Sequence, residues 1–316
     1  MSLREGIINI LEENLGHYVS GQEIANALSV SRSAVAKCID GLKKEGYDIK
    51  SVNRLGHCLA QTCNLLSEAR IAANIGDEVC VKVYKSIDST NTLAKKEIAN
   101  GLTRNAIFAS EEQTAGRGRS GKSFYSPKSS GLYFSCILHP SVTLSDSVCL
   151  TSAAAVAVCE AIEGATKKHP MIKWVNDIFI DGYKVCGILT EAVSDFESGT
   201  VQAVVIGIGI NLTTTQFPDE LTGIASSLGV SVDKSRLVAD IYTRLNELCN
   251  RLPDKSFMDI YRSHSLALGN TVYFSRNGKS YTATATAILD DGGLEVLTDE
   301  NEKMILQSGE ISIKLK

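Results

Sequence analysis

The spacing of apolar and polar residues divides the chain into three regions, and the first of them covers residues 1–63. Residues 20–23 spell S-x-x-E, a capping box that predicts the start of a helix. Ser31 is placed to cap a second helix, in which apolar residues recur at i, i+4 and i+7 from Val35. Two short strands with a turn between them are expected within residues 49–60. Two helices joined by a tight turn and followed by a hairpin predict a winged helix-turn-helix, whose second helix enters the major groove of DNA.

The same region carries a local excess of positive charge. From residue 31 to residue 54 there are six basic and three acidic side chains, whereas the whole chain has a net charge of −4. Any contact with nucleic acid should therefore come from this patch, where small polar and basic side chains can approach phosphates and base edges. A helical protein–protein module is the alternative interpretation. The residues expected to contact DNA are Ser31, Arg32, Ser33, Lys37 and Arg54.

The second region, residues 64–267, alternates between strand and helix spacing. Strands are expected at residues 81–86, 107–111, 132–138, 172–174, 178–180, 185–192 and 201–210. Helices are expected at residues 91–98, 148–162, 236–252 and 257–263. The strands on either side of the turn at residues 181–183 predict a hairpin, which favours an α+β fold with a mixed sheet over a regular doubly wound sheet.

The third region, residues 268–316, loses the helical spacing. Turn signals occur at Asn277-Gly278 and at residues 291–293, and residues 282–288 alternate as a strand does. This tail is expected to form a small β-barrel of four or five strands.

Composition adds limits to this picture. The 316 residues are 44% hydrophobic and 22% charged, a globular balance with enough apolar material for a sizeable core. No signal peptide is visible and the apolar stretches are too short for a membrane span, so no membrane partner is expected. The nine cysteines are odd in number and form no C-x-x-C pair, which favours free thiols in a reducing cytoplasm. The five histidines show no ligand spacing, so a zinc site is not expected.

The candidate chemistry begins with a loop rich in glycine and arginine. Gly116, Gly118 and Gly121 match the G-x-G-x-x-G spacing of a dinucleotide-binding fingerprint. We reject that interpretation, because the fingerprint requires a helix at the glycines and Lys-Ser-Phe-Tyr-Ser-Pro follows here. The glycines instead let the backbone wrap around an anion, while the guanidinium groups of Arg117 and Arg119 bind phosphate or carboxylate oxygens. Taken alone, the loop could equally be a solvated surface turn.

Polar groups elsewhere favour a ligand site over a surface turn. Residues 89–91, Ser-Thr-Asn, lie between a strand and a helix, where they form either a plain N-cap or a contact for a small polar ligand. Residues 173–177 combine a base, the single Trp, an amide and a carboxylate. Lys184 follows a hairpin turn, where a solvated charge on an edge strand is the simpler alternative. Residues 206–211 form a strand with two glycines, which often mark the close approach of a ligand or of backbone.

In this order the motifs resemble those of the biotin protein ligases. They are STN at residues 89–91, QTAGRGR-x-G at 113–121, KW-x-ND at 173–177, K-x-x-GIL-x-E at 184–191 and GIGIN at 207–211. With the N-terminal winged helix, the chain is similar to the bifunctional subgroup, the biotin operon repressors. The resemblance covers nearly the whole chain, and the set of motifs is highly specific although no single motif is. The chain departs from the family at Val175, where the pattern has Pro, and at Phe124, where it often has Trp.

The resemblance implies a fold and a division into domains. A winged helix-turn-helix DNA-binding domain is expected at residues 1–63, a mixed α/β catalytic domain of the biotin/lipoate ligase type at residues 64–267, and a small SH3-like β-barrel at residues 268–316. It also implies an enzyme, a biotin–[acetyl-CoA-carboxylase] ligase, that uses biotin, ATP and Mg²⁺. The acceptor would be a lysine of a biotin carboxyl carrier protein.

The resemblance also assigns roles to individual residues. The catalytic cations would be Arg117, Arg119 and Lys184. The biotin site would consist of Ser89, Thr90, Asn91, Gln113, Arg117, Gly118, Arg119, Lys184 and Gly187. The ATP and adenylate site would consist of Gly116, Arg119, Lys173, Asn176, Asp177 and Asn211, with Asp177 as the candidate ligand of Mg²⁺.

The implied reaction joins the biotin carboxylate to the α-phosphate of ATP and then transfers biotin from biotinyl-5′-adenylate to the acceptor lysine. The adenylate would also be the corepressor, which promotes homodimerisation and so the binding of a two-half-site operator. Two alternatives stay open: a ligase whose helix-turn-helix no longer binds specific DNA, and a biotin-sensing repressor without catalysis. A lipoate-attaching enzyme shares a related catalytic fold, but the Gly-Arg-Gly-Arg loop and the winged helix argue against that substrate.

Overall fold

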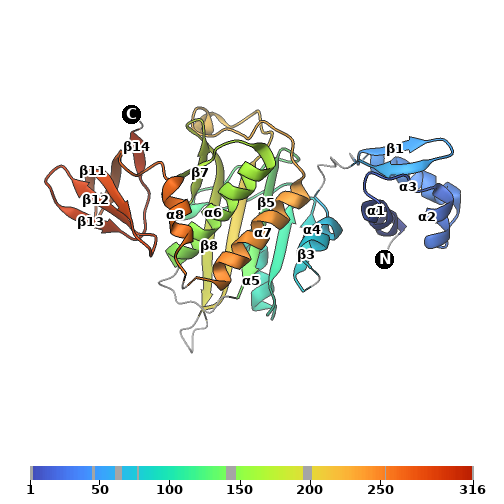
Figure 1. The fold of residues 1–316 in the computed structure, drawn as a ribbon, viewed down its shortest axis with the longest axis horizontal. Helices are drawn as coiled ribbons and strands as arrows, with labels where there is room; N and C mark the ends of the chain where they lie inside the picture. Colours follow the sequence, from blue (N-terminus) through green and yellow to red (C-terminus); the bar gives the residue numbers. More distant parts are fainter. Residues whose placement is uncertain are drawn as a thin grey trace.

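The fold was analysed in a computed structural model, which describes residues 3–44, 47–60, 66–76, 78–139, 147–194, 201–252 and 254–314. Figure 1 shows an N-terminal domain at one end, a large sheet with its helices in the middle, and a second sheet at the other end. The expected boundary between residues 63 and 64 lies outside the described residues. The division into domains at residues 1–63, 64–267 and 268–316 stays a prediction.

The N-terminal domain consists of three helices and a hairpin. These elements are α1 (Leu3–Glu13), α2 (Gly21–Ala27), α3 (Arg32–Lys44), β1 (Ile49–Val52) and β2 (Gly56–Leu59). The capping box is present, since the Ser20 side chain accepts from the Glu23 N–H and the Glu23 side chain accepts from the Ser20 N–H. The apolar face of α3 is buried at Val35, Ile39 and Leu42, as its spacing predicts. The strands β1 and β2 pair in antiparallel register, so the predicted helix-turn-helix with a hairpin is confirmed in its elements.

A seven-stranded sheet forms the centre of the protein. Its strands are β3 (Cys80–Tyr84), β4 (Ala106–Ser110), β5 (Gly131–Leu138), β6 (Met171–Lys173), β7 (Asp177–Ile180), β8 (Tyr183–Ser194) and β9 (Val201–Asn211). Their order is β3-β4-β5-β9-β8-β7-β6, and β3 and β4 pair in parallel whereas the other neighbours pair in antiparallel. The expected mixed sheet is confirmed, and the expected hairpin is the pair β7–β8.

Helices cover both faces of this sheet. They are α4 (Glu68–Ile75), α5 (Thr90–Ala99), α6 (Ser147–Thr166), α7 (Lys234–Asn250) and α8 (Phe257–Ser263). One face packs with α4, α6, α7 and α8 into the largest core cluster, whereas α5 packs on the other face through Ala94 and Ile98. The helix α4 was not expected from the sequence. The first turn of α5 lies beside β8 and β9, where residues of all three elements line a cavity.

The helix α6 is long and apolar enough to cross a membrane by length and composition, over Cys149–Thr166. However, 67% of that segment is buried inside the protein, where it packs on the sheet and against α7 and α8. A helix that is apolar nearly all round is typical of a protein core. Six of the eight described cysteines are likewise buried free thiols.

The C-terminal part is a five-stranded antiparallel sheet. Its strands are β10 (Thr271–Arg276), β11 (Lys279–Ile288), β12 (Leu294–Thr298), β13 (Lys303–Leu306) and β14 (Ser312–Lys314). They lie in the order β13-β12-β11-β10-β14, and among the described residues no pairing closes the row between β13 and β14. The five strands are confirmed, and the SH3-like barrel stays a prediction. The sheet is fastened to the central part, since Trp174 Nε1 donates to Gly292 O at 2.9 Å within the core.

Candidate active site

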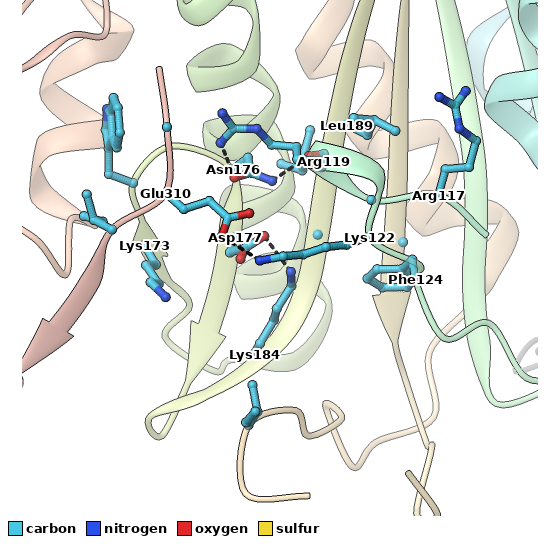
Figure 2. A pocket seen from close by; sticks show the side chains of 18 of the residues that line it. Arg117, Arg119, Lys122, Phe124, Lys173, Asn176, Asp177, Lys184, Leu189 and Glu310 are labelled. Atoms are coloured by element: carbon cyan, nitrogen blue, oxygen red, sulfur yellow. Dashed lines mark hydrogen bonds and ion pairs between the residues drawn. The ribbon is translucent and has the colours of Figure 1, made fainter. Parts of the chain in front are cut away.

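A cavity of about 880 Å³ opens where β8 and β9, the first turn of α5 and the C-terminal sheet converge. The segment 116–122, here called the arginine loop, forms part of its wall. Figure 2 shows side chains of residues that line it. The cavity is lined by most of the predicted site residues, namely Ser89, Thr90, Asn91, Gln113, Arg117, Gly118, Arg119, Lys173, Asn176, Asp177, Lys184 and Gly187.

One end of the cavity is formed by neutral polar groups at the start of α5. Ser89 caps the helix by accepting from Thr92 N–H at 3.4 Å, and Ser89, Thr90 and Asn91 are all at most 3% exposed. Thr90 N–H donates to Gln113 Oε1 at 2.8 Å, and Gln113 Nε2 donates to Ser126 Oγ at 3.0 Å. Buried polar groups need such partners, because a lost hydrogen bond in the interior costs about 1–3 kcal/mol. The Ser-Thr-Asn motif is therefore both a helix cap and part of a cavity wall.

Two residues that we did not predict from the sequence complete this arrangement. Ser135 on β5 is fully buried, and its Oγ lies 2.6 Å from Asn91 Oδ1 and 2.7 Å from Thr90 Oγ1. Glu191 on β8 accepts a hydrogen bond from Asn91 Nδ2 at 2.9 Å. We call Thr90, Asn91, Gln113, Ser126, Ser135 and Glu191 the polar network. Ser135 gave no signal in an apolar strand, whereas Glu191 had appeared as the last letter of a motif.

Glycines on β8 and β9 make room for the network and for an aromatic ring. A Cβ at Gly207 would lie 2.1 Å from Asn91 Oδ1, and one at Gly209 would lie 2.4 Å from the Phe124 ring. A Cβ at Gly187 would meet the same ring at 3.0 Å. The groups that approach these glycines closely are therefore side chains of the protein itself, whereas the approach of a ligand stays a prediction. Phe124, which replaces the Trp of the family pattern, packs edge-on against Tyr133 at a centroid distance of 6.4 Å.

The other end of the cavity is charged. Lys184 Nζ lies 2.7 Å from Asp177 Oδ1, and Lys122 Nζ of the arginine loop lies 2.6 Å from Oε2 of Glu310, which lies between β13 and β14. Lys173 also faces this space, where burial lowers the pKa of its ammonium group. The neighbouring Lys184 acts in the same direction on that pKa. Lysines held close together are a concentration of positive charge that an anion would stabilise.

Asn176 ties the arginine loop to the sheet. Arg119 Nη1 donates to Asn176 Oδ1 at 3.0 Å, and Asn176 Nδ2 donates to Ile188 O at 2.8 Å. Within the loop, Gly118 N–H donates to Lys122 O at 2.7 Å. The arginine loop therefore contains a single 3-10 turn at Arg119–Gly121 and is held at its base and at Arg119, rather than beginning an α-helix.

The structure does not bring all predicted residues to the cavity wall. Asn211 is buried at the end of β9, where its Nδ2 donates to Ser226 O at 3.0 Å, and it does not line the cavity. Gly116 also lies behind the wall, where an added Cβ would meet Phe124 O at 2.4 Å. Arg117 lines the cavity, but Figure 2 shows its guanidinium pointing away from Lys184. It lies 3.4 Å from Glu191 Oε1 instead.

Two carboxylates, Asp177 and Glu310, are among the described residues that line the cavity. No group of three or more His, Cys, Asp or Glu that could hold a metal occurs in the described ranges. Mg²⁺ is nevertheless commonly held by one or two carboxylates together with substrate phosphates. Asp177 lines the charged end of the cavity and has a carboxylate of the kind that such a site uses.

The residues expected to contact DNA form a separate surface on the N-terminal domain. Ser31, Arg32, Ser33 and Lys37 are exposed on the first turns of α3, and Arg54 is exposed at the tip of the hairpin. Ser31 Oγ accepts from Ala34 N–H at 3.2 Å and thereby caps α3, as expected. The N-terminus of α3 and the hairpin tip are thus both exposed, and their contact with DNA stays a prediction.

Comparison with known proteins connects these features. Residues 83–211 match the biotin/lipoate A/B protein ligase family and residues 4–57 match an HTH domain. The solved biotin protein ligase from Aquifex aeolicus in complex with biotin and ATP superposes with a TM-score of 0.64 at 27% identity, over 75% of this chain and 99% of that one.

Two relatives are named for both a ligase and a repressor role. The bifunctional ligase/repressor BirA of Escherichia coli is 28% identical over 73% of this chain and 72% of its own length. The protein of the same name from Bacillus spizizenii is 34% identical over 96% of this chain and 97% of its own length. An N-terminal HTH domain followed by a ligase fold, matched over almost the whole length of such a relative, shows that this chain belongs to the family of bifunctional biotin ligase/repressor proteins.

Proposed function

We propose that this protein is an ATP-dependent biotin–protein ligase that also acts as a biotin-responsive repressor. The observation that carries the ligase part is one cavity with a neutral polar end and a cationic end. The ureido ring of biotin has two N–H donors and one carbonyl acceptor, and hydroxyl and amide groups such as those of Thr90 and Asn91 can satisfy both. The carboxylate and the phosphates of ATP require cations, which Arg119, Lys173 and Lys184 supply at the other end.

In the first step, a biotin carboxylate oxygen attacks the α-phosphorus of ATP, and pyrophosphate leaves with the electron pair of the broken P–O bond. The step brings two anions together, so cations near the developing charge lower its barrier. Lys184, held at 2.7 Å from Asp177, is placed to contact the oxygens between the carboxylate and the phosphate. Bound Mg²⁺, held by Asp177 and phosphate oxygens, would supply further neutralisation of the pyrophosphate charge.

In the second step, the neutral amine of an acceptor lysine attacks the carbonyl carbon of the biotinyl-adenylate. An amide forms, AMP leaves, and the amine gives up a proton. Water would hydrolyse the same mixed anhydride, so it must be excluded until the acceptor arrives. The arginine loop and the C-terminal sheet, joined by Lys122 and Glu310, form a wall of the cavity that serves this purpose.

The proposal also covers two residues behind the cavity wall, the domain bounds, the acceptor protein and the location in the cell. Asn211 and Gly116 support the ATP side from behind the cavity wall rather than by direct contact. The domains span residues 1–63, 64–267 and 268–316, and the last is of the SH3-like type. The acceptor is a biotin carboxyl carrier protein, and a reducing cytoplasm as the location rests on the cysteine pattern of the sequence.

The repressor part rests on the exposed polar and basic residues of α3 and of the hairpin tip. A single winged helix reads one half-site, so a dimer would read two half-sites spaced by about one helical turn of DNA. Biotinyl-adenylate is the proposed signal for dimerisation. Ordering the arginine loop over the adenylate in advance removes an entropy cost that association would otherwise carry.

Mass spectrometry of a biotin-carrier domain incubated with the protein, biotin and MgATP tests the ligase. The expected result is a gain of one biotinyl group that depends on ATP and is lost in Lys184→Ala. A protein that binds biotin but never modifies the carrier domain would instead be a non-catalytic sensor.

Gel shifts with DNA from upstream of biotin-related genes test the repressor, with sedimentation velocity as the measure of dimerisation. Biotin and ATP together should tighten DNA binding and shift the protein to a dimer. DNA affinity that does not change with either ligand would contradict the repressor part. If the protein is an active ligase but binds no specific DNA, it is an enzyme whose helix-turn-helix has no repressor function.

A further inference from the structure

Glu191 lies outside the cavity wall, yet three side chains converge on it. Lys95 Nζ of α5 is 2.7 Å from its Oε1, Asn91 Nδ2 donates to its Oε2 at 2.9 Å, and Arg117 Nη1 lies 3.4 Å from Oε1. Its side chain is only 21% exposed. None of the mechanistic steps above uses this carboxylate, although it joins the helix that carries Asn91 to the arginine loop.

The charge of Glu191 determines what it can do. Burial works to raise its pKa, but the hydrogen bonds from Lys95 and Asn91, together with the charges of Lys95 and Arg117, outweigh burial and lower it. Glu191 is therefore ionised at neutral pH. An ionised carboxylate can only accept hydrogen bonds, so the group opposite it must be a donor.

This requirement fixes the orientation of the Asn91 amide. The amide nitrogen faces two acceptors, Glu191 Oε2 and Leu189 O at 3.3 Å, while Oδ1 faces the Ser135 hydroxyl at 2.6 Å. A serine hydroxyl can donate or accept, and it accommodates either orientation of the amide. The acceptors on the other side are what exclude the flipped amide, and of the two Glu191 is the charged one with the shorter contact.

The orientation of the Asn91 amide affects the direction of the next hydrogen bonds in the polar network. Ser135 has one hydroxyl proton, which goes to Asn91 Oδ1 when Asn91 is held in this way. The same oxygen lies 2.7 Å from Thr90 Oγ1, so toward Thr90 it can then only accept. Thr90 also faces Gln113 Oε1, which accepts from the Thr90 hydroxyl at 3.1 Å and from the Thr90 N–H at 2.8 Å. With Asn91 held in this way, the Thr90 proton points to Ser135 or Gln113, and its oxygen lone pairs are left for the cavity.

We propose that Glu191 is a positioning residue for the cyclic urea of biotin: by holding the Asn91 amide in one orientation, it sets the donor and acceptor pattern of the neutral end of the cavity. The inference rests on the proposed function and deepens it. It separates the recognition of the urea from the charged end, where Lys184 and Asp177 act. Glu191 need not touch the ligand for this role.

Glu191→Gln in the full-length protein tests the inference, because glutamine has nearly the same shape but offers both a donor and an acceptor to Asn91. Calorimetry with biotin alone should show a dissociation constant about 10-fold higher, the effect of one weakened buried hydrogen bond. The dissociation constant for ATP should stay unchanged. Glu191→Asp, which keeps an acceptor-only group, should recover part of the biotin affinity. Glu295→Gln, which removes a carboxylate on β12 that is equally half-buried and paired with Lys303, serves as the control and should leave both constants unchanged.

A double-mutant comparison shows whether Glu191 affects biotin binding through the Asn91 amide or in some other way. In an Asn91→Ala background, Glu191→Gln should have no further effect on biotin binding, because the amide that it orients is gone. A full 10-fold effect in that background would overturn the inference, as would biotin affinity equal to that of the parent in the single variant. A parent protein that binds no biotin would overturn the proposed function and this inference together, whereas a parent that binds biotin separates the two.

Discussion

Lys184 and Asp177 face each other across the neighbouring strands β8 and β7, with Nζ 2.7 Å from Oδ1. The cation proposed to stabilise the first step is thus held by a carboxylate before substrate binds. Holding it in place means that little reorganisation is required when negative charge develops. It also means that the charge of Lys184 is balanced in the free protein, so removing the lysine leaves Asp177 unpaired.

Lys184→Ala should therefore slow adenylate formation by roughly 100-fold or more, the usual cost of one preorganised electrostatic contact. Single-turnover release of pyrophosphate from biotin and MgATP measures this step directly. Transfer from synthetic biotinyl-adenylate to a carrier domain should be much less affected. Lys303→Ala, on the exposed strand β13, is the control. A variant that forms adenylate at the rate of the parent would remove Lys184 from the mechanism.

Arg119→Gly should release the arginine loop from the sheet, because the hydrogen bond from Arg119 Nη1 to Asn176 Oδ1 is lost and glycine adds backbone freedom. The expected result is dissociation of biotinyl-adenylate at least about 10-fold faster than from the parent. Filter binding of radiolabelled adenylate after dilution measures the rate. Arg119→Lys, which keeps the charge without the planar fork, should lie between the two. Equal retention of adenylate by Arg119→Gly would contradict the role of the loop as a clamp.

The helices and strands were largely predictable, because the spacing of apolar residues and the helix-capping residues can be read from neighbouring positions in the sequence. The helix α8 begins and ends where it was expected, and the strands of the central sheet differ by a few residues at their ends. The helix α4 was missed, since it has only eight residues and its buried face includes Arg70. Its signals were present all the same: Ser67 caps it, Glu68 begins it and Gly76 follows it.

The site was predictable only in part, because spacing along the chain does not reveal which way side chains point. Arg117 and Lys184 were grouped as catalytic cations, yet Arg117 lies beside Glu191 and away from Lys184. Asn211 was assigned to ATP, yet its amide holds Ser226 behind the wall. Ser135 joins the network only because α5 packs on the same face of the sheet, a tertiary contact with no sequence signature.

Gly207→Ala should weaken biotin binding, because the new Cβ would lie 2.1 Å from Asn91 Oδ1 and the amide would have to move. We expect the dissociation constant for biotin to rise by roughly 10-fold or more, as one or two buried hydrogen bonds are lost. Calorimetry measures it. The matched control is Gly164→Ala in α6, where the added Cβ meets no atom within 4 Å and should stabilise the helix by about 1 kcal/mol. Biotin affinity unchanged in Gly207→Ala would show that Asn91 does not take part in binding.

Glu12 joins the N-terminal domain to the central part, and its carboxyl group is poorly accommodated there. Its Oε2 is buried, and no residue in the described part of the chain hydrogen-bonds to it. Burial raises the pKa of Glu12 above its ordinary value of 4.5, with Asp233 acting in the same direction and a hydrogen bond with Ser67 and the charge of Arg70 opposing. The folded protein therefore favours the protonated form more than the unfolded chain does.

The sign of the pH dependence follows from this direction. At a pH below the pKa of Glu12 in the unfolded chain, Glu12 is protonated in both the folded and the unfolded state and its ionisation does not affect stability. As pH rises through the folded-state pKa, the cost of ionising a buried carboxyl lowers stability, and the loss persists at pH 7. Glu12→Gln, neutral at every pH, should therefore raise the midpoint of thermal unfolding at pH 7 and bring little gain near pH 4. Circular dichroism melts at both pH values measure this, with the exposed neighbour Glu13→Gln as control. A gain of equal size at both pH values would mean that packing, rather than ionisation, limits stability at this junction.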